Sequence, residues 1–276
     1  MRPTEILRRA TAYLDRHGVD SPRTSAEILL AEVLKTDRAG LYTRVDGLSA
    51  AEARAFGRSL CLRCTGVPVQ HLTGRQQFRN VELEVRPGVF VPRPETEMMV
   101  DVALEELRNT AEPVVIDVGT GAGAIALSIA QERPDAAVWA TDFSAAAVEL
   151  TLENAARLGL DVRVVRGDLF GGLPHELAGR VDAIVSNPPY VRSDEFEALS
   201  PEARADPELA LRGGPEVYVR LAQESTSWLA SGGRLVVEIG ATHGDEVRAS
   251  FAEDLADVRV LPDVAGRDRV VIGRAR

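Results

Sequence analysis

The sequence contains few cysteines and no long hydrophobic run. Its 276 residues include 2 cysteines, too few for a disulfide scaffold and consistent with a reducing compartment. No stretch reaches the ~18 uncharged apolar residues that a membrane span needs. The first ten residues lack the apolar segment of a secretory signal. These absences predict a cytoplasmic protein with no membrane partner.

Clustered basic side chains are also missing. The chain has 32 basic and 42 acidic residues, a formal charge of -10, and Lys35 is its single lysine. Stable binding to nucleic acid requires clustered Lys and Arg to neutralise phosphates, so we do not expect it here. Cys61 and Cys64 lie in a helical pattern without a second pair, and the histidines show no ligand spacing, so no metal site is expected.

Residues 1–74 are predicted to be helical. Apolar positions recur at helical spacing, for example at Leu7, Ala10 and Leu14, and Ser49 is a plausible N-cap of a later helix. The length of the chain favours one large or two modest domains. We expect this part to form a small bundle of short antiparallel helices.

Residues 75–92 have the alternating pattern of β-structure. Phe78, Val81 and Leu83 alternate with polar residues and lead to Pro87-Gly88, after which Val89–Val91 is again apolar. The pattern predicts a β-hairpin that turns at Pro87-Gly88 and joins the helical domain to the rest of the chain.

From residue 93 onward, short apolar strands alternate with helices. A helix is predicted over 95–107. Strands are predicted at 114–118, 137–142, 162–168, 181–187 and 234–240, and a final antiparallel pair at 258–261 and 269–272. The helices between them are predicted at 123–132, 144–158 and 216–229. This alternation is typical of an α/β domain whose parallel sheet is covered on both faces.

The first strand of this domain runs directly into a glycine-rich loop, where ligands of such sheets bind. The loop consists of Gly119, Thr120, Gly121, Ala122 and Gly123. Glycines let the backbone approach a ligand closely, and the helix N-terminus that follows offers free N–H groups. The loop predicts a nucleotide-like ligand, either a dinucleotide or S-adenosylmethionine, rather than a tight turn alone.

Acidic residues end the next two strands. Asp142 is placed to accept both ribose hydroxyls of an adenosine; alternatively it caps the following helix, a role that Ser144 can fill itself. Asp168 and Leu169 are placed to meet the edge and the face of an adenine, and the alternative for Asp168 is an ordinary turn residue.

The fourth strand ends in a rigid turn made of Asn187, Pro188, Pro189 and Tyr190. The two prolines leave the carbonyls of Asn187 and Pro188 without neighbouring amide partners. Together with the Asn187 side-chain oxygen they can accept hydrogen bonds from an –NH2 group, and Tyr190 adds an aromatic wall. Such bonds raise the electron density of a poorly nucleophilic amide nitrogen and align it with a methyl donor. The turn therefore favours S-adenosylmethionine over a dinucleotide, the alternatives being a structural Pro-Pro turn or a WW-domain ligand.

At these residues the sequence resembles the protein-(glutamine-N5) methyltransferases that modify class-1 peptide chain release factors, the PrmC/HemK family. The resemblance covers nearly the whole chain. Besides the Asn187–Tyr190 turn, it rests on the segments Gly66–Gly74, Val91–Glu97, Asp206–Leu211, Glu238–Gly240 and Gly266–Val270.

The resemblance implies a fold and a reaction. The fold is a seven-stranded, Rossmann-like, S-adenosylmethionine-dependent methyltransferase domain at 93–276, preceded by a helical substrate-recognition domain at 1–74 and a β-hairpin linker at 75–92. The reaction is methylation of the glutamine amide nitrogen in the Gly-Gly-Gln motif of release factors, with S-adenosylhomocysteine as product and without a metal. We expect a monomer.

The resemblance also implies a role for each candidate site residue. The Gly119–Gly123 loop would hold the methionine part of the cofactor, Asp142 the ribose, and Asp168 with Leu169 the adenine. The Asn187–Tyr190 turn would bind the substrate glutamine amide.

Some positions near the site depart from the family pattern or have no assigned role. Ala122 replaces a frequent serine or threonine, and Leu169 replaces a frequent aromatic residue, so we expect weaker cofactor binding rather than lost activity. The segment after Gly213-Gly214 is shorter than usual. Arg93 and Glu95 would lie at the pocket edge or form a structural ion pair.

Two other functions remain as alternatives. The same turn serves any planar –NH2 group, so the chain could be an adenine-N6 methyltransferase acting on nucleic acid; the acidic charge and the missing basic segment count against this. The chain could also be a non-catalytic cofactor-binding scaffold, against which the intact Asn187–Tyr190 turn argues.

Overall fold

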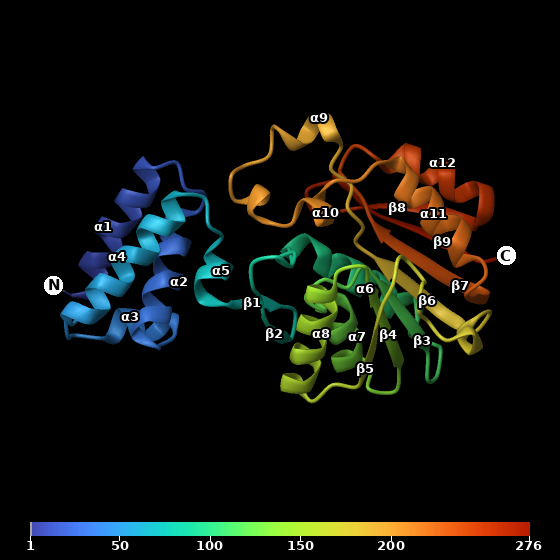
Figure 1. Cartoon of the computed structure of the whole chain (residues 1–276), viewed down its shortest axis with the longest axis horizontal. Coiled ribbons are helices and arrows are strands. Elements are labelled where there is room, and N and C mark those ends of the chain that lie inside the picture. The colour runs from blue at the N-terminus through green and yellow to red at the C-terminus, as the bar shows by residue number, and fades with distance from the viewer. Residues whose placement is uncertain (1) are drawn as a thin grey trace. The chain divides into compact units, whose positions relative to one another are not determined.

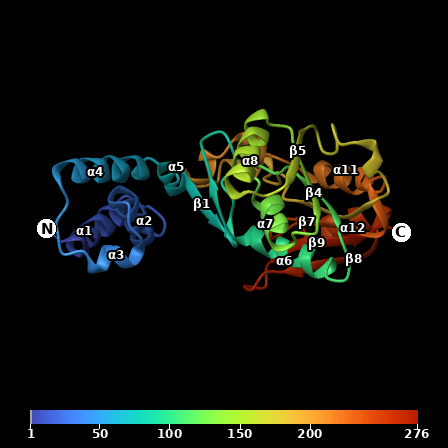
Figure 2. The ribbon, with the colours of Figure 1, turned by 90° about the horizontal axis from the view of Figure 1, so that it is seen from below.

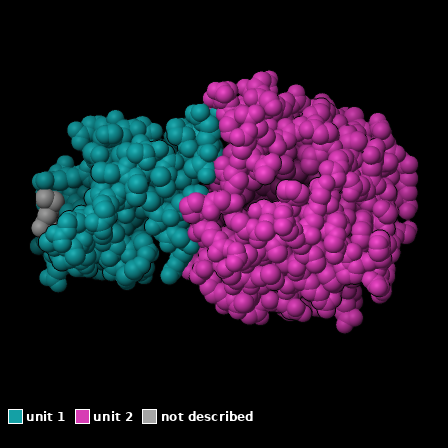
Figure 3. Space-filling model, in the orientation of Figure 1, with its two compact units in different colours: residues 1–75, 199–205 teal, residues 76–198, 206–276 magenta. Residues whose placement is uncertain are grey.

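A computed structural model describes residues 2–276, which divide into two compact units (Figure 1). One unit comprises the chain up to Arg75 together with Leu199–Ala205, and the other comprises Gln76–Ala198 and Asp206–Arg276. The first unit is thus built from two separate stretches of the chain, coloured alike in Figure 3. No helix in the span from 2 to 276 is long and apolar enough to cross a membrane.

The first unit is a bundle of short helices, as predicted. Leu7, Ala10 and Leu14 are buried on one face of its first helix. Ser49 caps a later helix in a capping box with Glu52, which confirms the predicted helix start. The helices are α1 (Pro3–Arg16), α2 (Pro22–Leu34), α3 (Arg38–Thr43), α4 (Ala50–Cys64) and α5 (Val69–Thr73), and the second stretch adds the 3-10 turn η3 (Ala203–Ala205).

A buried arginine ties the second stretch of this unit to the bundle. Arg63 on α4 is 4% exposed and forms an ion pair with Glu202. Its guanidinium also donates hydrogen bonds to Ser25 Oγ at 3.4 Å and to the Val67 carbonyl at 3.3 Å. Because these partners satisfy the buried charge, the segment around Glu202 completes the bundle.

The second unit is an α/β domain. Its strands are β1 (Arg75–Phe78), β2 (Val81–Glu84), β3 (Val114–Val118), β4 (Ala137–Asp142), β5 (Val162–Arg166), β6 (Val181–Ser186), β7 (Leu229–Glu238), β8 (Ala256–Pro262) and β9 (Asp268–Arg274). Its helices are η1 (Pro94–Thr96), α6 (Glu97–Glu106), α7 (Ala124–Glu132), α8 (Ala145–Leu158), η2 (His175–Leu177), α9 (Ser193–Phe196), α10 (Glu208–Leu211), α11 (Pro215–Ser225) and α12 (Gly244–Asp254).

The main sheet has seven strands in the order β5-β4-β3-β6-β7-β9-β8. Strands β3 to β7 are parallel, and β9 runs antiparallel to both β7 and β8. The chain proceeds from β3 outward to β4 and β5, then returns to place β6 on the other side of β3. The strand order therefore reverses between β3 and β6, which is where ligands bind in sheets of this type.

Helices cover both faces of the sheet (Figure 2). Val115 and Ile116, consecutive on β3, belong to two different buried clusters, one shared with α6 and α7 and the other with α11 and α12. Because both faces are covered, the central strands are mostly apolar, and this is what made them legible in the sequence. The predicted α/β class and seven-stranded Rossmann-like sheet are confirmed.

Most predicted strand bounds agree with the structure, and two need correction. Strands β3 and β4 have the predicted bounds. Strand β5 ends at Arg166, so Asp168 lies in the turn beyond it, and β7 begins at Leu229 rather than at Arg234. Glycines at the start of β7 concealed this longer strand from a pattern based on apolar residues.

The hairpin forms, but the predicted position of its turn was wrong. Strands β1 and β2 pair around Arg79-Asn80, and Val89–Val91 is not a strand. Arg79 adopts a left-handed conformation with φ 47°. Its guanidinium donates hydrogen bonds to Glu132 at 2.7 Å and to Asp101 at 2.7 Å, and these distant carboxylates stabilise a turn that local sequence does not indicate. The hairpin residues from Gln76 onward belong to the second unit.

Candidate active site

The glycine loop and the Asn-Pro-Pro-Tyr turn leave two neighbouring strands at the same level of the sheet. Val118, the last residue of β3, is in register with Ser186, the last residue of β6. The Ser186 hydroxyl donates a hydrogen bond to the Val118 carbonyl at 2.8 Å. The loop at Gly119 and the turn at Asn187 therefore begin side by side at the switch point of the sheet. The face of this unit seen in Figure 3 is hollowed.

The glycine loop has the backbone conformation that its sequence predicted. Gly119 and Gly121 adopt φ values of 79° and 59°, which residues with side chains rarely adopt, and a Cβ at either position would meet open space. The loop is held from β4, because the Thr141 carbonyl accepts hydrogen bonds from the N–H groups of Gly119 at 2.8 Å and Thr120 at 3.0 Å. The loop thus presents an open backbone surface on a fixed frame.

Ala122 is explained by its surroundings. Its side chain is buried in an apolar cluster with Val85, Val89, Ala147 and Leu150. A hydroxyl-bearing residue there would face apolar groups, so the alanine matches the packing of this chain.

A buried aspartate lies beneath the loop. Asp117 is fully buried, and its Oδ2 accepts hydrogen bonds from Thr120 Oγ1 at 2.7 Å and from the Ala126 N–H at 3.1 Å. Its Oδ1 has no hydrogen-bond partner among the described residues. Burial raises the pKa of Asp117 to about 7. No role was predicted for this residue, and the structure shows that it connects the loop to the first turn of α7.

Asp142 lies at the end of β4, directly against the loop. Its Oδ2 accepts a hydrogen bond from the Gly121 N–H at 2.9 Å, and its Oδ1 accepts one from the Ser144 N–H at 2.8 Å. Burial raises its pKa. The N-cap of α8 is Ser144, whose hydroxyl accepts from the Ala147 N–H, so the alternative helix-capping role of Asp142 is not needed. Ribose binding by Asp142 stays a prediction.

Asp168 and Leu169 lie in the turn after β5. Asp168 is exposed and forms an ion pair with Arg220 of α11 at 2.9 Å. Leu169 adopts a left-handed conformation with φ 48°, and its carbonyl accepts a hydrogen bond from Thr141 Oγ1 at 2.7 Å. Thr141 therefore holds both the glycine loop and this turn, a role that the sequence did not indicate. The adenine contact of Asp168 and Leu169 stays a prediction.

The Asn187–Tyr190 turn is supported from several directions. Asn187 Nδ2 donates a hydrogen bond to Thr96 Oγ1 at 3.1 Å. Tyr190 packs edge-on against His243, with 6.4 Å between the ring centroids. A Cβ on Gly213 would lie 1.7 Å from the Pro189 carbonyl oxygen, so only glycine permits the chain to pass there. Thr96 lies in the Val91–Glu97 segment on which the family resemblance rests, but the sequence assigned it no role, and Gly213, which marks this close approach, was noted only for the short segment that follows it.

Glu238 at the end of β7 is a second buried carboxyl group near the turn. It is 2% exposed, and burial raises its pKa to about 7, opposed by hydrogen bonds from Thr96 and Tyr190 and by the charge of Arg269. Burial and the negative charge of Glu238 likewise raise the pKa of Tyr190 to about 12. In the sequence, Glu238 stood out only as part of the family motif Glu238–Gly240.

Arg93 and Glu95, the two residues expected at the edge of the site, have different surroundings. Arg93 forms an ion pair with the buried carboxylate of Asp206, which also accepts a hydrogen bond from the Val91 N–H at 3.0 Å. The arginine lies over the Phe90 ring, with 5.2 Å from its Cζ to the centroid. Arg93 thus forms the structural ion pair that was one of its two predicted roles, and its partner is Asp206. Glu95 is exposed.

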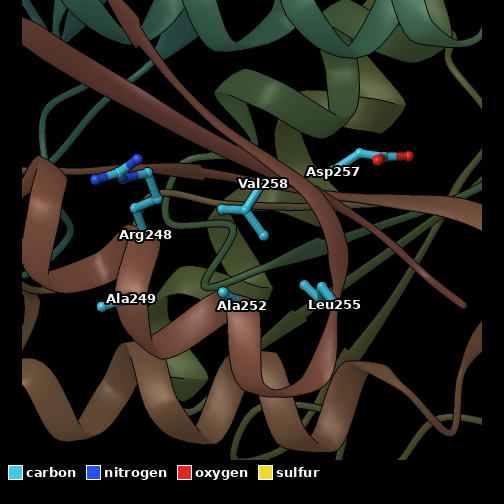
Figure 4. A pocket seen from close by; sticks show the side chains of 6 residues that line it. All are labelled: Arg248, Ala249, Ala252, Leu255, Asp257 and Val258. Atoms are coloured by element: carbon cyan, nitrogen blue, oxygen red, sulfur yellow. The ribbon is translucent and has the colours of Figure 1, made fainter.

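A separate shallow cavity of about 260 Å³ lies between α12 and β8 (Figure 4). It is lined by Arg248, Ala249, Ala252, Leu255, Asp257 and Val258. None of these is a predicted site residue, and we assign the cavity no role. No group of three or more His, Cys, Asp or Glu residues that could hold a metal ion occurs in the described part of the chain.

Comparison with known proteins first defines the class. Residues 5–74 match the family model described as the PrmC N-terminal domain, and residues 80–203 match the methyltransferase small domain. Among solved structures, a 16S rRNA N2 G1207 methyltransferase from T. thermophilus, in complex with AdoMet and guanosine, is similar with a TM-score of 0.55 at 21% identity, over 73% of this chain and 50% of that one. A methyltransferase from Pyrococcus furiosus has a TM-score of 0.51 at 19% identity, over 71% of this chain and 89% of that one. The second unit thus has the Rossmann-like fold of methyltransferases.

Closer relatives define the family. A release factor glutamine methyltransferase from Deinococcus radiodurans is 41% identical over 99% of both chains. Another, from Moorella thermoacetica, is 38% identical over 99% of this chain and 98% of the relative. The chain belongs to the release factor glutamine methyltransferase family, as the sequence motifs predicted.

Proposed function

We propose that this enzyme methylates the side-chain amide nitrogen of the glutamine in the Gly-Gly-Gln motif of class-1 peptide chain release factors. The observation that carries the proposal is the position of Asn187. It follows Ser186 at the switch point, beside the start of the glycine loop, so an amide bound by the turn would adjoin a donor held by the loop. Family membership supports the same substrate.

The methyl donor is S-adenosylmethionine, and the residues at the β3 and β4 ends fit it. The open backbone at Gly119 and Gly121 accommodates the methionine part. The half-buried Asp142 carboxylate retains lone pairs beyond those used by Gly121 and Ser144, which suits the two ribose hydroxyls. Asp168 and Leu169 lie next along the same edge, for the adenine. Bound S-adenosylmethionine supplies an electrophilic methyl carbon and leaves as S-adenosylhomocysteine.

The chain itself binds and orients the acceptor. Asn187 Oδ1 and the Pro188 carbonyl accept hydrogen bonds from the two protons of the glutamine –NH2 group. These bonds raise the electron density at the nitrogen and fix the direction of its lone pair. Tyr190 and the two prolines exclude water from the amide. The proton released from nitrogen can leave after transfer, so the turn needs no strong base and no metal.

We infer that the protein acts as a cytoplasmic monomer, with the helical domain at 1–74 recognising the release factor. The formal charge of -10 opposes stable binding to nucleic acid.

Mass spectrometry of a release factor incubated with the enzyme and S-adenosylmethionine tests the proposal. We expect one added methyl group on the Gly-Gly-Gln peptide, and none with the Asn187→Ala variant. An unmodified release factor together with intact cofactor binding would overturn the assigned substrate. Methylation of adenine in an oligonucleotide under the same conditions would favour the alternative acceptor.

A further inference from the structure

The Asn187 side chain must be oriented to act as an acceptor. Its amide has an oxygen at one end and an –NH2 group at the other, and only the oxygen can accept a proton from a substrate amide. In this structure Nδ2 donates to Thr96 Oγ1 at 3.1 Å. That bond occupies the donor end inside the protein and leaves the Oδ1 end for the substrate.

Thr96 can hold the donor end only if its own proton points elsewhere. A threonine hydroxyl has one proton, which it donates to a single acceptor. Thr96 is 3% exposed, and the buried carboxyl group of Glu238 lies close enough to interact with its hydroxyl, so we infer that Glu238 is the acceptor of the Thr96 proton. When Glu238 is ionised it only accepts, so the Thr96 proton is drawn toward it and the Thr96 lone pairs face Asn187.

Glu238 is surrounded by groups from several elements. The Tyr190 hydroxyl, after β6, also lies near its carboxyl group, Arg269 on β9 contributes a positive charge, and Glu95 on η1 contributes a negative one. Tyr218 on α11 lies near enough for the Glu238 charge to raise its pKa further, beyond the larger effect of burial. Glu238 Oε2 has no hydrogen-bond partner among residues 2–276. One buried carboxylate thus contacts both the support of Asn187 and the aromatic wall of the turn.

We propose that Thr96 and Glu238 are positioning residues, which act through a hydrogen-bond chain from Glu238 to Thr96 to Asn187 to keep the Asn187 oxygen directed at the substrate amide. The inference rests on the proposed function and adds to it the residues that orient the acceptor. No contact of Thr96 or Glu238 with substrate or cofactor is required.

The chain of hydrogen bonds predicts how acid affects the enzyme. Burial raises the pKa of Glu238 to about 7. Once protonated, Glu238 can donate to Thr96, whose own proton is then free to turn toward Asn187. The Asn187 amide would rotate to accept that proton, placing its –NH2 group against the substrate –NH2 group. Turnover therefore falls as the pH falls through about 7.

The first test compares Thr96→Val with Thr96→Ser. Valine has nearly the shape of threonine but no hydroxyl, so Asn187 Nδ2 loses its partner. We expect kcat on a release factor to fall about ten- to a hundredfold in Thr96→Val. The dissociation constant for S-adenosylmethionine and the melting temperature should stay close to those of the wild type. Thr96→Ser keeps the hydroxyl and should recover most of kcat.

The second test uses the pH profile of kcat with both substrates saturating. With a controlling pKa of about 7, wild-type kcat should be about tenfold higher at pH 8 than at pH 6. The glutamine of Glu238→Gln cannot titrate, so its ratio of kcat at pH 8 to kcat at pH 6 should fall below about threefold. Thr96→Val should likewise lose the decrease of kcat at low pH. The matched control is Glu253→Gln, an exposed residue of α12, which should keep the wild-type profile.

The outcomes separate this inference from the proposed function. If the wild type does not methylate the release factor, the proposed function is wrong. If the wild type is active and Thr96→Val matches it, or if Glu238→Gln keeps the tenfold ratio, the positioning chain is wrong. A loss in Thr96→Val that serine does not rescue would indicate a packing role only, and would also overturn the inference.

Discussion

The glycine loop after β3 and the Asn-Pro-Pro-Tyr turn after β6 each rest on a buried carboxyl group with a pKa of about 7, but the partners of the two groups differ. Beneath the loop, Asp117 binds Thr120 and Ala126, three and nine residues further along the chain. Beneath the turn, Glu238 lies beside Thr96 and Tyr190, which come from other parts of the sequence. The carboxyl group beneath the cofactor loop thus binds only residues close to it in sequence, whereas Glu238 is far in sequence from the turn that it supports.

This difference has a physical consequence for the two sites. The glycine loop is supported by Asp117 on β3 and by Thr141 and Asp142 on the adjacent strand β4, so it can keep its shape when residues on η1 or β7 change. A turn whose acceptor is oriented by residues on η1 and β7 is sensitive to changes far from it in sequence. The following predictions test whether cofactor binding and acceptor positioning can be altered separately.

The largest effect is expected from removing the acceptor itself. Asn187→Ala should lower kcat about 10²- to 10³-fold, because a preorganised hydrogen-bond group is lost from the reacting amide. The S-adenosylmethionine dissociation constant, measured by calorimetry, should change less than about twofold. A variant that lost cofactor binding to the same extent would show that the two sites are not separable.

The buried carboxyl beneath the loop should make stability depend on pH. The raised pKa of Asp117 means that the folded protein retains a proton which the unfolded chain releases between about pH 4 and 7. The free energy of unfolding should therefore fall as the pH rises across this window, by up to roughly 4 kcal/mol for a shift of about three units. Glu238 acts in the same direction.

Asp117→Asn removes the contribution of Asp117 to the pH dependence of the free energy of unfolding. In urea unfolding, the variant should gain stability relative to the wild type as the pH rises from 5 to 8. The exposed Asp161→Asn serves as the matched control and should show no such trend. A stability difference between Asp117→Asn and the wild type that stays constant over this range would show that Asp117 is ionised throughout.

Asp142→Ala should act on the cofactor alone. Losing the acceptor of the Gly121 N–H and the contacts predicted for the ribose should weaken S-adenosylmethionine binding about tenfold or more. With saturating cofactor, kcat should stay within about threefold of the wild type, since Asn187 is held by different residues. Unchanged affinity in calorimetry would remove Asp142 from the ribose site.

The smallest effect is expected at Asp168. Its ion pair with Arg220 is exposed, so Asp168→Ala should change the free energy of unfolding by less than about 0.5 kcal/mol. If Asp168 contacts adenine, this variant should weaken cofactor binding several-fold. Arg220→Ala breaks the same ion pair but keeps the Asp168 carboxylate, so it should not weaken cofactor binding. Equal losses in the two variants would argue against the adenine contact.

The same contrast explains how much the sequence predicted. The strands β3 and β4, the glycine loop and the start of α4 at Ser49 depend on local patterns, and each was predicted correctly. The hairpin turn at Arg79 was missed because carboxylates far along the chain stabilise it.

The candidate site likewise contains features that the sequence predicted and features that it did not. The Asn187–Tyr190 turn was legible because prolines restrict the backbone wherever they occur. Its supports, Thr96 and Glu238, lie in segments on which the family resemblance rests, but the sequence assigned them no role, since no periodicity connects η1 with the end of β7. Thr141 was missed for the same reason, as its two loops come from different strands.

The discontinuous first unit limits how this protein can be divided for engineering. Cutting after Arg75 would remove the bundle but leave Leu199–Ala205 behind, without the residues it packs against. The isolated bundle would in turn keep Arg63 buried and without Glu202. Neither fragment is an independent module, so exchanging the N-terminal domain between homologues requires transplanting both stretches together.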